Sequence, residues 1–413
     1  MKNSEIEWIG EIPDSWEMIP NKHLFLDHSQ KVGEKWTNYK LLSLTTSGVK
    51  EKDINSTGGK IPDSYENYQT VVPGDMVFCL FDLDCSAVFS GLSAYSGMIT
   101  SAYDVFAVND NLIDEKYIDY WFQYVFSNRY YKMYSKNIRY TVTGETFGAT
   151  LTPVPPIKTQ RKIGVFLKNK CAEVDKLIDI QQAQIDKLKE YKQSVITEAV
   201  TKGLDPTVPM KDSGVEWIGM IPCEWKIIKV GSIFACRNEK VSDVDFAPLS
   251  VSRGGVVPQM ENVAKSDAGD NRKLVLKNDF VINSRSDRKQ SCGVSPLDGS
   301  VSLINTVLYP VNDDIICPEY TNIIMKNYGF AEEFYRWGHG IVADLWTTRW
   351  QEMKNIVLPL PSIKIQSEIV KAVIQKINTI NSLIALKQAK IDKLQEYKKS
   401  LIYEYVTGKK EVM

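Results

Sequence analysis

The sequence predicts an α+β protein in which two globular modules of mixed α/β structure are separated by two long helices. The helices are expected to pack as an antiparallel coiled coil within a pseudo-twofold internal repeat. Three observations predict this class. Motifs in the first half of the 413-residue chain return in the second half. Each half ends in an amphipathic stretch of about forty residues. The parts before these stretches are rich in short β-type runs.

The repeat is most regular where the long helices are expected. Ile185–Thr201 aligns without a gap with Ile391–Thr407, a shift of 391 − 185 = 206 positions. The opening Trp8-Ile-Gly-Glu-Ile-Pro-Asp-Ser-Trp16 returns at Trp217–Trp225, a shift of 217 − 8 = 209 positions. A constant shift means that the stretch tolerates no insertions, as in a continuous helix. The shift changes from 209 to 206 positions only upstream of this stretch, so the variable part of the repeat lies there.

This repeat divides the chain into four parts. Residues 1–155 form a first module, 156–205 a central long helix, 206–360 a second module and 361–413 a C-terminal long helix. Proline residues precede each helix, and Gly203 and Gly408 follow them, as expected for helix ends. A lone amphipathic helix of about forty residues, roughly 60 Å long, cannot bury its apolar stripe. We therefore expect the two helices to pack on each other.

The apolar stripe of each helix follows seven-residue ladders. We expect the helices to pack through Val174, Ile178, Ile185, Leu188, Tyr191 and Val195 in the first, and through Val373, Ile377, Ile384, Ile391, Leu394, Tyr397 and Leu401 in the second.

Short β-type runs punctuated by Gly, Asn, Asp and Pro fill both modules. The expected strands are Lys40–Thr46, Val71–Phe81, Ala102–Val108, Ala247–Ser252, Lys273–Asn283 and Val301–Val311. One short helix is expected in each module, at Lys116–Phe126 and at Pro318–Tyr328.

No catalytic constellation is apparent in the sequence. It contains no GxxxxGK[ST] phosphate loop, no Asn/Asp-Pro-Pro-Tyr signature of amino-methyltransferases and no nucleophile elbow. Seven cysteines without a CxxC pair and three scattered histidines make a metal site unexpected. Asp344 with Glu352 and Lys354 resembles the acid–acid–Lys set of metal-dependent nucleases, but so short a pattern arises by chance. We expect neither a catalytic residue nor a cofactor.

The composition is that of a soluble globular protein, with 43% apolar and 24% charged residues. The chain begins without the apolar region of a signal peptide, and no apolar run suggests a membrane span, so a cytoplasmic location is expected. The net charge of −1 and the pI of about 6.4 are not those of a basic nucleic-acid binder. Contact with DNA would then require local basic patches, or a partner that shares the phosphates.

Such patches are present in both modules. Basic residues lie among aromatic and hydroxyl side chains, a combination suited to phosphate and base-edge contacts. An arginine can bind a guanine edge with both ends of its guanidinium, and Asn or Gln can bind adenine. The candidate DNA-binding residues are Arg129, Lys132, Lys136, Arg139 and Tyr140 in the first module, and Arg253, Asn283, Arg285, Arg288, Lys289, Gln290 and Arg349 in the second. Leu80 and Phe81 align with Ser284 and Arg285, so the modules should read different bases.

Together these motifs resemble the specificity subunit of Type I restriction–modification enzymes. The resemblance rests on the two Trp-Ile-Gly-x-Ile-Pro-x-x-Trp openings, the Pro-rich segments that end at Gln160 and Gln366, and the twin Ile-Asp-Lys-Leu-x-Glu-Tyr-Lys helices. It covers nearly the whole chain. Thr159 and Ile365 depart from the pattern, because the family often has Glu before this glutamine.

The resemblance implies a division of labour. Each module would be a target recognition domain that reads one half of a bipartite site in double-stranded DNA. The helices would set the spacer and dock two modification (methyltransferase) subunits, which bind S-adenosylmethionine. Restriction (endonuclease/translocase) subunits would join the complex, and this chain would be its non-catalytic part in a bacterium or archaeon.

Two other interpretations remain open. The chain could be the recognition component of a Type IIB/IIG-like restriction–methyltransferase assembly, or a coiled-coil scaffold without sequence-specific DNA binding. The sequence contains no catalytic domain, which counts against the first. Two different α+β modules are not explained by the second.

Overall fold

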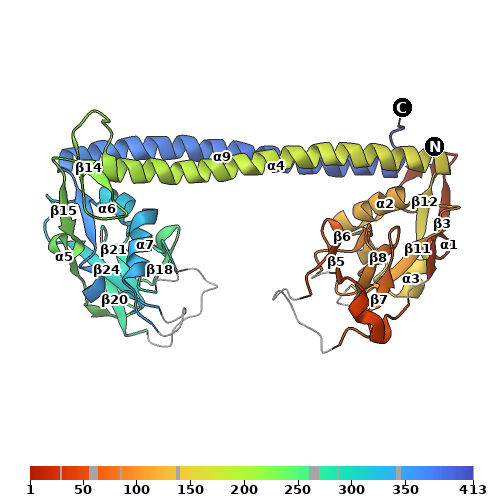
Figure 1. Ribbon diagram of the computed structural model, residues 1–413, viewed down its shortest axis with the longest axis horizontal. Coiled ribbons are helices and arrows are strands. Elements are labelled where there is room, and N and C mark those ends of the chain that lie inside the picture. The colour runs from red at the N-terminus through yellow and green to blue at the C-terminus, as the bar shows by residue number, and fades with distance from the viewer. Residues whose placement is uncertain are drawn as a thin grey trace. The chain divides into compact units, whose positions relative to one another are not determined.

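The computed structural model describes residues 1–27, 30–54, 64–83, 86–135, 140–259, 269–285, 288–340 and 346–412. The chain forms two compact units (Figure 1). Unit 1 comprises Met1–Gln182 with Ala389–Met413, and unit 2 comprises Ala183–Gln388. Each unit therefore contains one module together with a segment of each long helix.

The elements of unit 1 begin with short strands and end in a long helix. In chain order they are β1 (Lys2–Asn3), β2 (Glu11–Ile12), β3 (Glu17–Pro20), α1 (Asn21–Leu24), β4 (Phe25–Asp27), the 3-10 helix η1 (Gly33–Asn38), β5 (Leu42–Thr45), β6 (Gly48–Glu51), β7 (Gln69–Val71), β8 (Met76–Phe78), β9 (Ser90–Leu92), β10 (Gly97–Ile99), β11 (Asp104–Val108), α2 (Glu115–Ser127), the 3-10 helix η2 (Tyr130–Met133), α3 (Gly144–Ala149), β12 (Leu151–Val154) and the start of α4 (Ile157–Lys202).

Unit 2 repeats this order closely. After the end of α4 come β13 (Met210–Asp212), β14 (Met220–Pro222), β15 (Lys226–Lys229), α5 (Val230–Ile233), β16 (Phe234–Cys236), β17 (Lys240–Val241), β18 (Leu249–Ser252), β19 (Gly255–Pro258), β20 (Arg272–Val275), β21 (Phe280–Asn283), β22 (Cys292–Val294), β23 (Gly299–Val301), β24 (Asn305–Pro310), α6 (Pro318–Met325), α7 (Tyr328–Arg336), α8 (Trp350–Met353), β25 (Val357–Leu360) and the start of α9 (Ile363–Val406).

The two modules share one sheet topology. The central antiparallel sheet has the order β4-β11-β8-β9 in unit 1 and β16-β24-β21-β22 in unit 2. Strand β12 pairs with β3 just before α4, and β25 pairs with β15 in the same way just before α9. Each module buries its apolar side chains against its own helix segments, because Leu401 and Val406 join the core of unit 1, and Val200 and Ile369 that of unit 2. The predicted internal repeat is thus present in three dimensions.

Some local predictions need correction. The run Val71–Phe81 is two strands, β7 and β8, and Lys273–Asn283 is likewise divided into β20 and β21. In both places an aspartate accepts a hydrogen bond from a backbone N–H three residues earlier, at 2.8 Å for Asp75 and 2.9 Å for Asp279. At these turns the chain passes from one sheet to another, since β7 and β8 belong to different sheets, as do β20 and β21. The predicted helix at Pro318–Tyr328 ends at Met325, and α7, which was not predicted, follows it.

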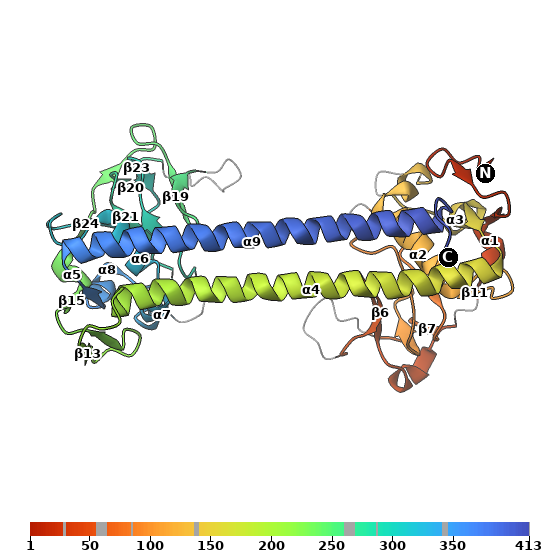
Figure 2. The same ribbon diagram turned by 90° about the horizontal axis from the view of Figure 1, so that it is seen from above.

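The long helices pair antiparallel within each unit (Figure 2). In unit 1, Phe166 contacts Tyr405 and Lys398 pairs with Asp175 at 2.7 Å. Residue numbers therefore increase along α4 where they decrease along α9. In unit 2, Lys387 donates to Gln184 and Lys192 donates to Asn381. The Lys192–Asn381 contact is the repeat of the Lys398–Asp175 contact, because 398 − 192 and 381 − 175 are both 206. The predicted antiparallel packing is confirmed.

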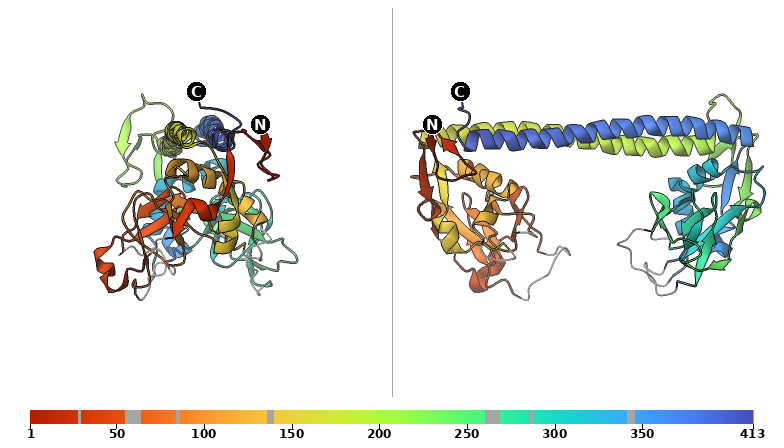
Figure 3. Two further views of the ribbon diagram at one scale, coloured as in Figure 1. Left: turned by 90° about the vertical axis from the view of Figure 1, so that its right-hand side faces the viewer. Right: turned by 180° about the vertical axis from the view of Figure 1, so that it is seen from behind.

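The repeated Trp-Ile-Gly-x-Ile-Pro-x-x-Trp motif covers the far end of each helix. Gly203 ends α4 with a φ of 78° and Gly408 ends α9 with a φ of 70°, the left-handed conformation that stops a helix. A Cβ on Gly203 would lie 3.3 Å from Trp225, and one on Gly408 would lie 3.1 Å from Trp16. The N-terminal motif thus packs on the C-terminal helix, and both chain ends lie together in unit 1 (Figure 3).

Candidate nucleic-acid interface

A basic surface lies in unit 2, on two segments that backbone contacts hold side by side. The loop after β21 carries Arg285 and Arg288, and the segment before α8 ends at Arg349. Thr348 N–H donates to the Ser284 carbonyl at 2.8 Å, and Arg285 forms a β-bridge with Thr347. Arg288 and Arg349 are exposed and Arg285 is half-buried. We call these three arginines the basic patch of unit 2.

Other predicted residues of this loop have internal partners. Lys289 Nζ lies 2.8 Å from both carboxylate oxygens of Glu332 and 4.5 Å from the centre of the Tyr335 ring. Gln290 adopts a left-handed φ of 62° and donates to the Lys326 carbonyl, and Asn283 accepts from the Arg285 N–H. The charge of Lys289 is largely balanced by Glu332. These three residues therefore fix the shape of the loop that presents the basic patch.

Trp346 lies beside the basic patch, at the edge of the segment that contains Arg349. Its ring stacks on Tyr335 with centroids 5.8 Å apart, and its indole N–H donates to the Tyr335 carbonyl. Glu352, part of the nuclease-like pattern, accepts from the Arg349 N–H and caps α8. Asp344 lies outside the described residues.

The corresponding region of unit 1 is aromatic. Val142 N–H donates to the Leu80 carbonyl at 2.8 Å, which repeats the Thr348–Ser284 contact of unit 2. Phe81 therefore occupies the position of Arg285, and its ring stacks on Tyr103. The two modules present an aromatic ring and a guanidinium group at equivalent places, which is the difference expected of surfaces that contact different bases.

The remaining candidates of unit 1 lie near η2. Arg129 precedes this helix with a left-handed φ of 56°, and Lys132 Nζ lies 4.3 Å above the ring of Tyr140. Lys136 and Arg139 lie outside the described residues.

A hairpin projects from each module at a matching position. Strands β5 and β6 turn at Thr46 and Ser47, and strands β18 and β19 turn at Arg253 and Gly254. Arg253 is exposed at its tip. The same backbone element thus carries two hydroxyls in one module and a cation in the other.

A glutamine fastens each long helix to its module. Gln160 is fully buried, donates to the carbonyls of Leu112 and Pro155 at 2.9 and 2.7 Å, and accepts from the Asp114 N–H at 2.6 Å. Gln366 is equally buried and makes the same three bonds, to Ile315, Pro361 and Cys317. The sequence marked both glutamines as repeated motif residues but did not reveal this clamp. These hydrogen bonds fix the first turn of each long helix to the backbone of its own module.

Most of the predicted helix-packing side chains lie between the helices or against the modules. Buried members are Val174, Ile185, Val195, Val373, Ile391 and Leu401, and half-buried members are Ile178, Leu188, Ile377, Ile384 and Leu394. The prediction is wrong for Tyr191 and Tyr397, each of which is 53% exposed. The seven-residue ladder places both at the edge of the apolar stripe, where about half of each side chain stays exposed.

Exposed apolar side chains on the helices obey the same repeat. Leu177 and Leu383 are 43% and 42% exposed, and Ile180 and Leu386 are 42% and 68% exposed. Together with Tyr191 and Tyr397 they form what we call the outer apolar stripe. Each of these three residues of α4 has an apolar counterpart 206 positions later in α9. Unit 1 therefore carries Leu177, Ile180 and Tyr397, and unit 2 carries the equivalent set Leu383, Leu386 and Tyr191. The chain therefore presents this set of exposed apolar side chains twice.

Asp119 on α2 lies where α2 approaches the long helices. Burial raises the pKa of this carboxyl to about 6, although Gln123 and the Leu92 N–H donate hydrogen bonds to it. In unit 2 the equivalent side chain is Asn322, which accepts from the Val294 N–H. An amide thus fills the same position without a charge.

We expect Asp119→Asn to stabilise the protein at pH 8 and to have little effect below pH 4. The unfolded carboxyl ionises near pH 4, whereas the folded one holds its proton until about pH 6. The free energy of unfolding therefore falls as pH rises between these values, and the variant should regain about 2–3 kcal/mol above pH 6. Urea unfolding at pH 4 and pH 8 measures this, with Asp110→Asn on the exposed surface as control. Equal midpoints for Asp119→Asn and the parent protein at pH 8 would contradict it.

No group of three His, Cys, Asp or Glu side chains is placed to hold a metal ion within the part of the chain that the structure describes. One helix of that part, α9, is long and apolar enough to cross a membrane by length and composition alone. This differs from the expectation that the chain has no apolar run long enough to span a bilayer. Val373, Ile380 and Ile391 of α9 are buried within the protein, although only 17% of its most apolar 18-residue stretch is buried.

Comparisons with known proteins support this architecture. The chain is 22% identical to the type I restriction enzyme MjaX specificity subunit of Methanocaldococcus jannaschii, covering 97% of this chain and 95% of the relative. It is 23% identical to the MjaVIII specificity subunit of the same organism, covering 62% of this chain and 61% of that one. No family model matches the chain.

Solved structures show the same fold. A chain from a structure of a type I R-M system superposes with a TM-score of 0.68 at 13% identity, covering 96% of this chain and 98% of that chain. The HsdS subunit from Thermoanaerobacter tengcongensis gives a TM-score of 0.50 at 14% identity, with the same coverage. The predicted fold class and the predicted resemblance to type I specificity subunits are thereby confirmed.

Proposed function

We propose that this chain is the DNA-recognition, or specificity, subunit of a type I restriction–modification system. The observation that carries the proposal is the repeated unit itself. One module with its helix segments occurs twice, with the same strand order and the same glutamine clamp, but with different side chains on the presented loops. Such a protein suits a bipartite target, because each unit can read one half of it. Full-length similarity to specificity subunits supports this assignment.

The chain itself is non-catalytic in this proposal. It acts in the cytoplasm of a bacterium or archaeon, and methylation is carried out by modification subunits that bind S-adenosylmethionine. The two versions of the outer apolar stripe, one in each unit, support the docking of two such subunits on the helices. Restriction subunits would join through the complex. The partners would also supply part of the positive charge that a chain of net charge −1 lacks.

A reconstitution assay tests this proposal. The purified chain, mixed with its cognate modification subunit, should confer methylation of one bipartite DNA sequence, and neither protein alone should do so. Methylation by the chain alone would contradict its non-catalytic role. Sequence-independent DNA binding by the complex would favour a coiled-coil scaffold instead.

The basic patch should determine part of the second half-sequence. We expect Arg285→Ala to reduce the discrimination between bases at one base pair of the target by about 1–3 kcal/mol, the value of a bidentate arginine contact. The half-sequence read by unit 1 should remain unchanged. Methylome sequencing of cells that carry the variant with its partners measures both halves. Arg336→Ala serves as control, because Arg336 is exposed on α7 and pairs with Glu216 outside the basic patch. A full, unaltered target for Arg285→Ala would remove Arg285 from the interface.

A further inference from the structure

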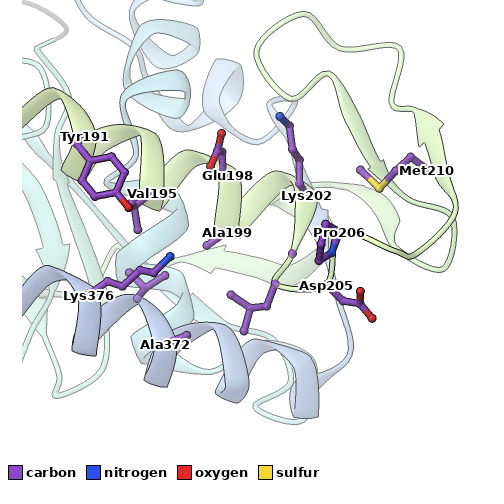
Figure 4. Close-up of a pocket in the computed structure, with 13 residues that line it drawn as sticks. Tyr191, Val195, Glu198, Ala199, Lys202, Asp205, Pro206, Met210, Ala372 and Lys376 are labelled. Carbon is purple, nitrogen blue, oxygen red and sulfur yellow. The ribbon is translucent and has the colours of Figure 1, made fainter.

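Unit 2 contains an open groove between the end of α4 and the start of α9. It has a volume of about 450 Å³ and is lined on its apolar side by Val195 and Ala199 of α4 and by Ala372 and Val373 of α9 (Figure 4). Tyr191 lies at one end of the groove, and Leu204 and Met210 line it beyond the end of α4. The charged groups along its edge are Glu198, Lys202, Asp205 and Lys376, so an apolar floor lies inside a rim of mixed charge.

Unit 1 fills the equivalent place with its own side chains. The counterparts of Ala199 and Ala372 are Tyr405 and Phe166, because 405 − 199 and 372 − 166 are both 206. Their rings are in contact, with centroids 4.5 Å apart and planes at 47°. Two methyl groups in unit 2 thus replace two packed rings in unit 1. The groove exists because of this paired difference.

A second paired difference lies at the same helix ends. In unit 1, Tyr403 of α9 packs on Tyr124 of α2 with ring centroids 5.4 Å apart. Their counterparts in unit 2 are Thr197 and Asn327, which are joined by a hydrogen bond of 2.8 Å. The end of α9 is therefore consistently filled by aromatic side chains, and the end of α4 consistently carries small or polar ones. The two units therefore differ here in two pairs of contacting side chains and not in a single residue.

The groove continues the outer apolar stripe, since Tyr191 belongs to both. We propose, resting on the proposed function, that the groove of unit 2 receives a large apolar or aromatic side chain from a helix of one modification subunit. The occupant has the chemistry that fills the equivalent space in unit 1, namely a ring. Two identical modification subunits present the same side chain to both units, and in unit 1 the Phe166–Tyr405 ring pair already occupies the equivalent space. The two docking surfaces therefore bind unequally, and unit 2 is occupied first.

The inequality can be estimated from the burial of one large side chain. Full burial of such a group favours unit 2 by about 10- to 100-fold in dissociation constant. Partner residues around the buried ring would meet both positive and negative groups of the rim, as is usual at the edge of an interface. The complex with a single modification subunit should therefore accumulate before the complex with two.

Native mass spectrometry tests this on the full chain, titrated with the purified cognate modification subunit. The expected result is stepwise loading with two dissociation constants that differ by about 10- to 100-fold. The double variant Ala199→Tyr, Ala372→Phe gives unit 2 the ring pair of unit 1 and should weaken the tighter step until the two are equal. The reverse variant Phe166→Ala, Tyr405→Ala should strengthen the weaker step.

Ala372→Glu provides a second variant in case the double variant does not fold, since Ala372 is half-buried and a single carboxylate there should reduce the tighter step alone. Two equal constants for the unaltered chain, or an unchanged tighter step in a folded Ala372→Glu variant, would overturn the inference. If no version of the chain binds the modification subunit, the proposed function itself fails. That outcome is distinct from binding at two equal sites.

Discussion

Replacing Gln160 by leucine is expected to destabilise unit 1 by about 3–5 kcal/mol. The side chain is fully buried and satisfies three backbone groups, the carbonyls of Leu112 and Pro155 and the N–H of Asp114. Leucine has a similar size but no polar atom, so all three groups would lose their partner. An unpaired buried group costs about 1–3 kcal/mol, which makes this one of the largest single-residue effects in the protein.

The repeat supplies a matched experiment. Gln366→Leu should destabilise unit 2 by a similar amount, because Gln366 makes the same three bonds. Urea unfolding followed by tryptophan fluorescence should show one altered transition in each variant. Gln193→Leu, on the exposed face of α4, controls for the substitution itself. A change below about 1 kcal/mol in Gln160→Leu would mean that water replaces the side chain, and the clamp would then have no energetic role.

A matched insertion in both long helices is expected to lengthen the spacer of the recognised site. We would duplicate residues 176–182 in α4 and residues 382–388 in α9, two segments that stand 206 positions apart. Seven residues keep the apolar seam in phase and add about 10 Å, or roughly three base pairs of DNA. Both half-sequences should remain the same, because no module residue changes.

Methylome sequencing reads both parts of this result at once. The control is the same insertion in α4 alone, which shifts contacts such as Lys398–Asp175 out of register and should reduce methylation altogether. A deletion confined to residues 170–181 of one helix would disturb the pairing in the same way. Altered half-sequences in the matched insertion would contradict the role of the helices as a spacer.

The long helices were the most predictable part of the protein. The expected span 156–205 compares with the observed Ile157–Lys202, because a helix is determined by local periodicity and by the prolines and glycine at its ends. Strands were less predictable. A run such as Val71–Phe81 is apolar on both sides of its turn, and only Pro73, Gly74 and Asp75 indicate that the strand is interrupted there.

The basic segments of the candidate interface could be identified from the sequence, but their arrangement in space could not. Arg285, Arg288 and Arg349 come from segments about sixty positions apart, and only the backbone contact of Thr348 with Ser284 brings them together. Lys289 looked equivalent to them in the sequence, yet its ion pair with Glu332 on α7 depends on a helix that the pattern did not reveal. Nor could the ladder of Tyr191 and Tyr397 indicate which side of the stripe the partner helix leaves uncovered.

The discontinuity of unit 1 determines the order in which the protein can mature on the ribosome. Unit 2 is contiguous in the chain and has all its residues once Gln388 has emerged. Unit 1 begins first, but its core includes Leu401, Ile402 and Val406, which are translated after the whole of unit 2. Until then the first module exposes the apolar surface that these residues cover. The second half of the nascent chain should therefore be able to fold completely before the first half.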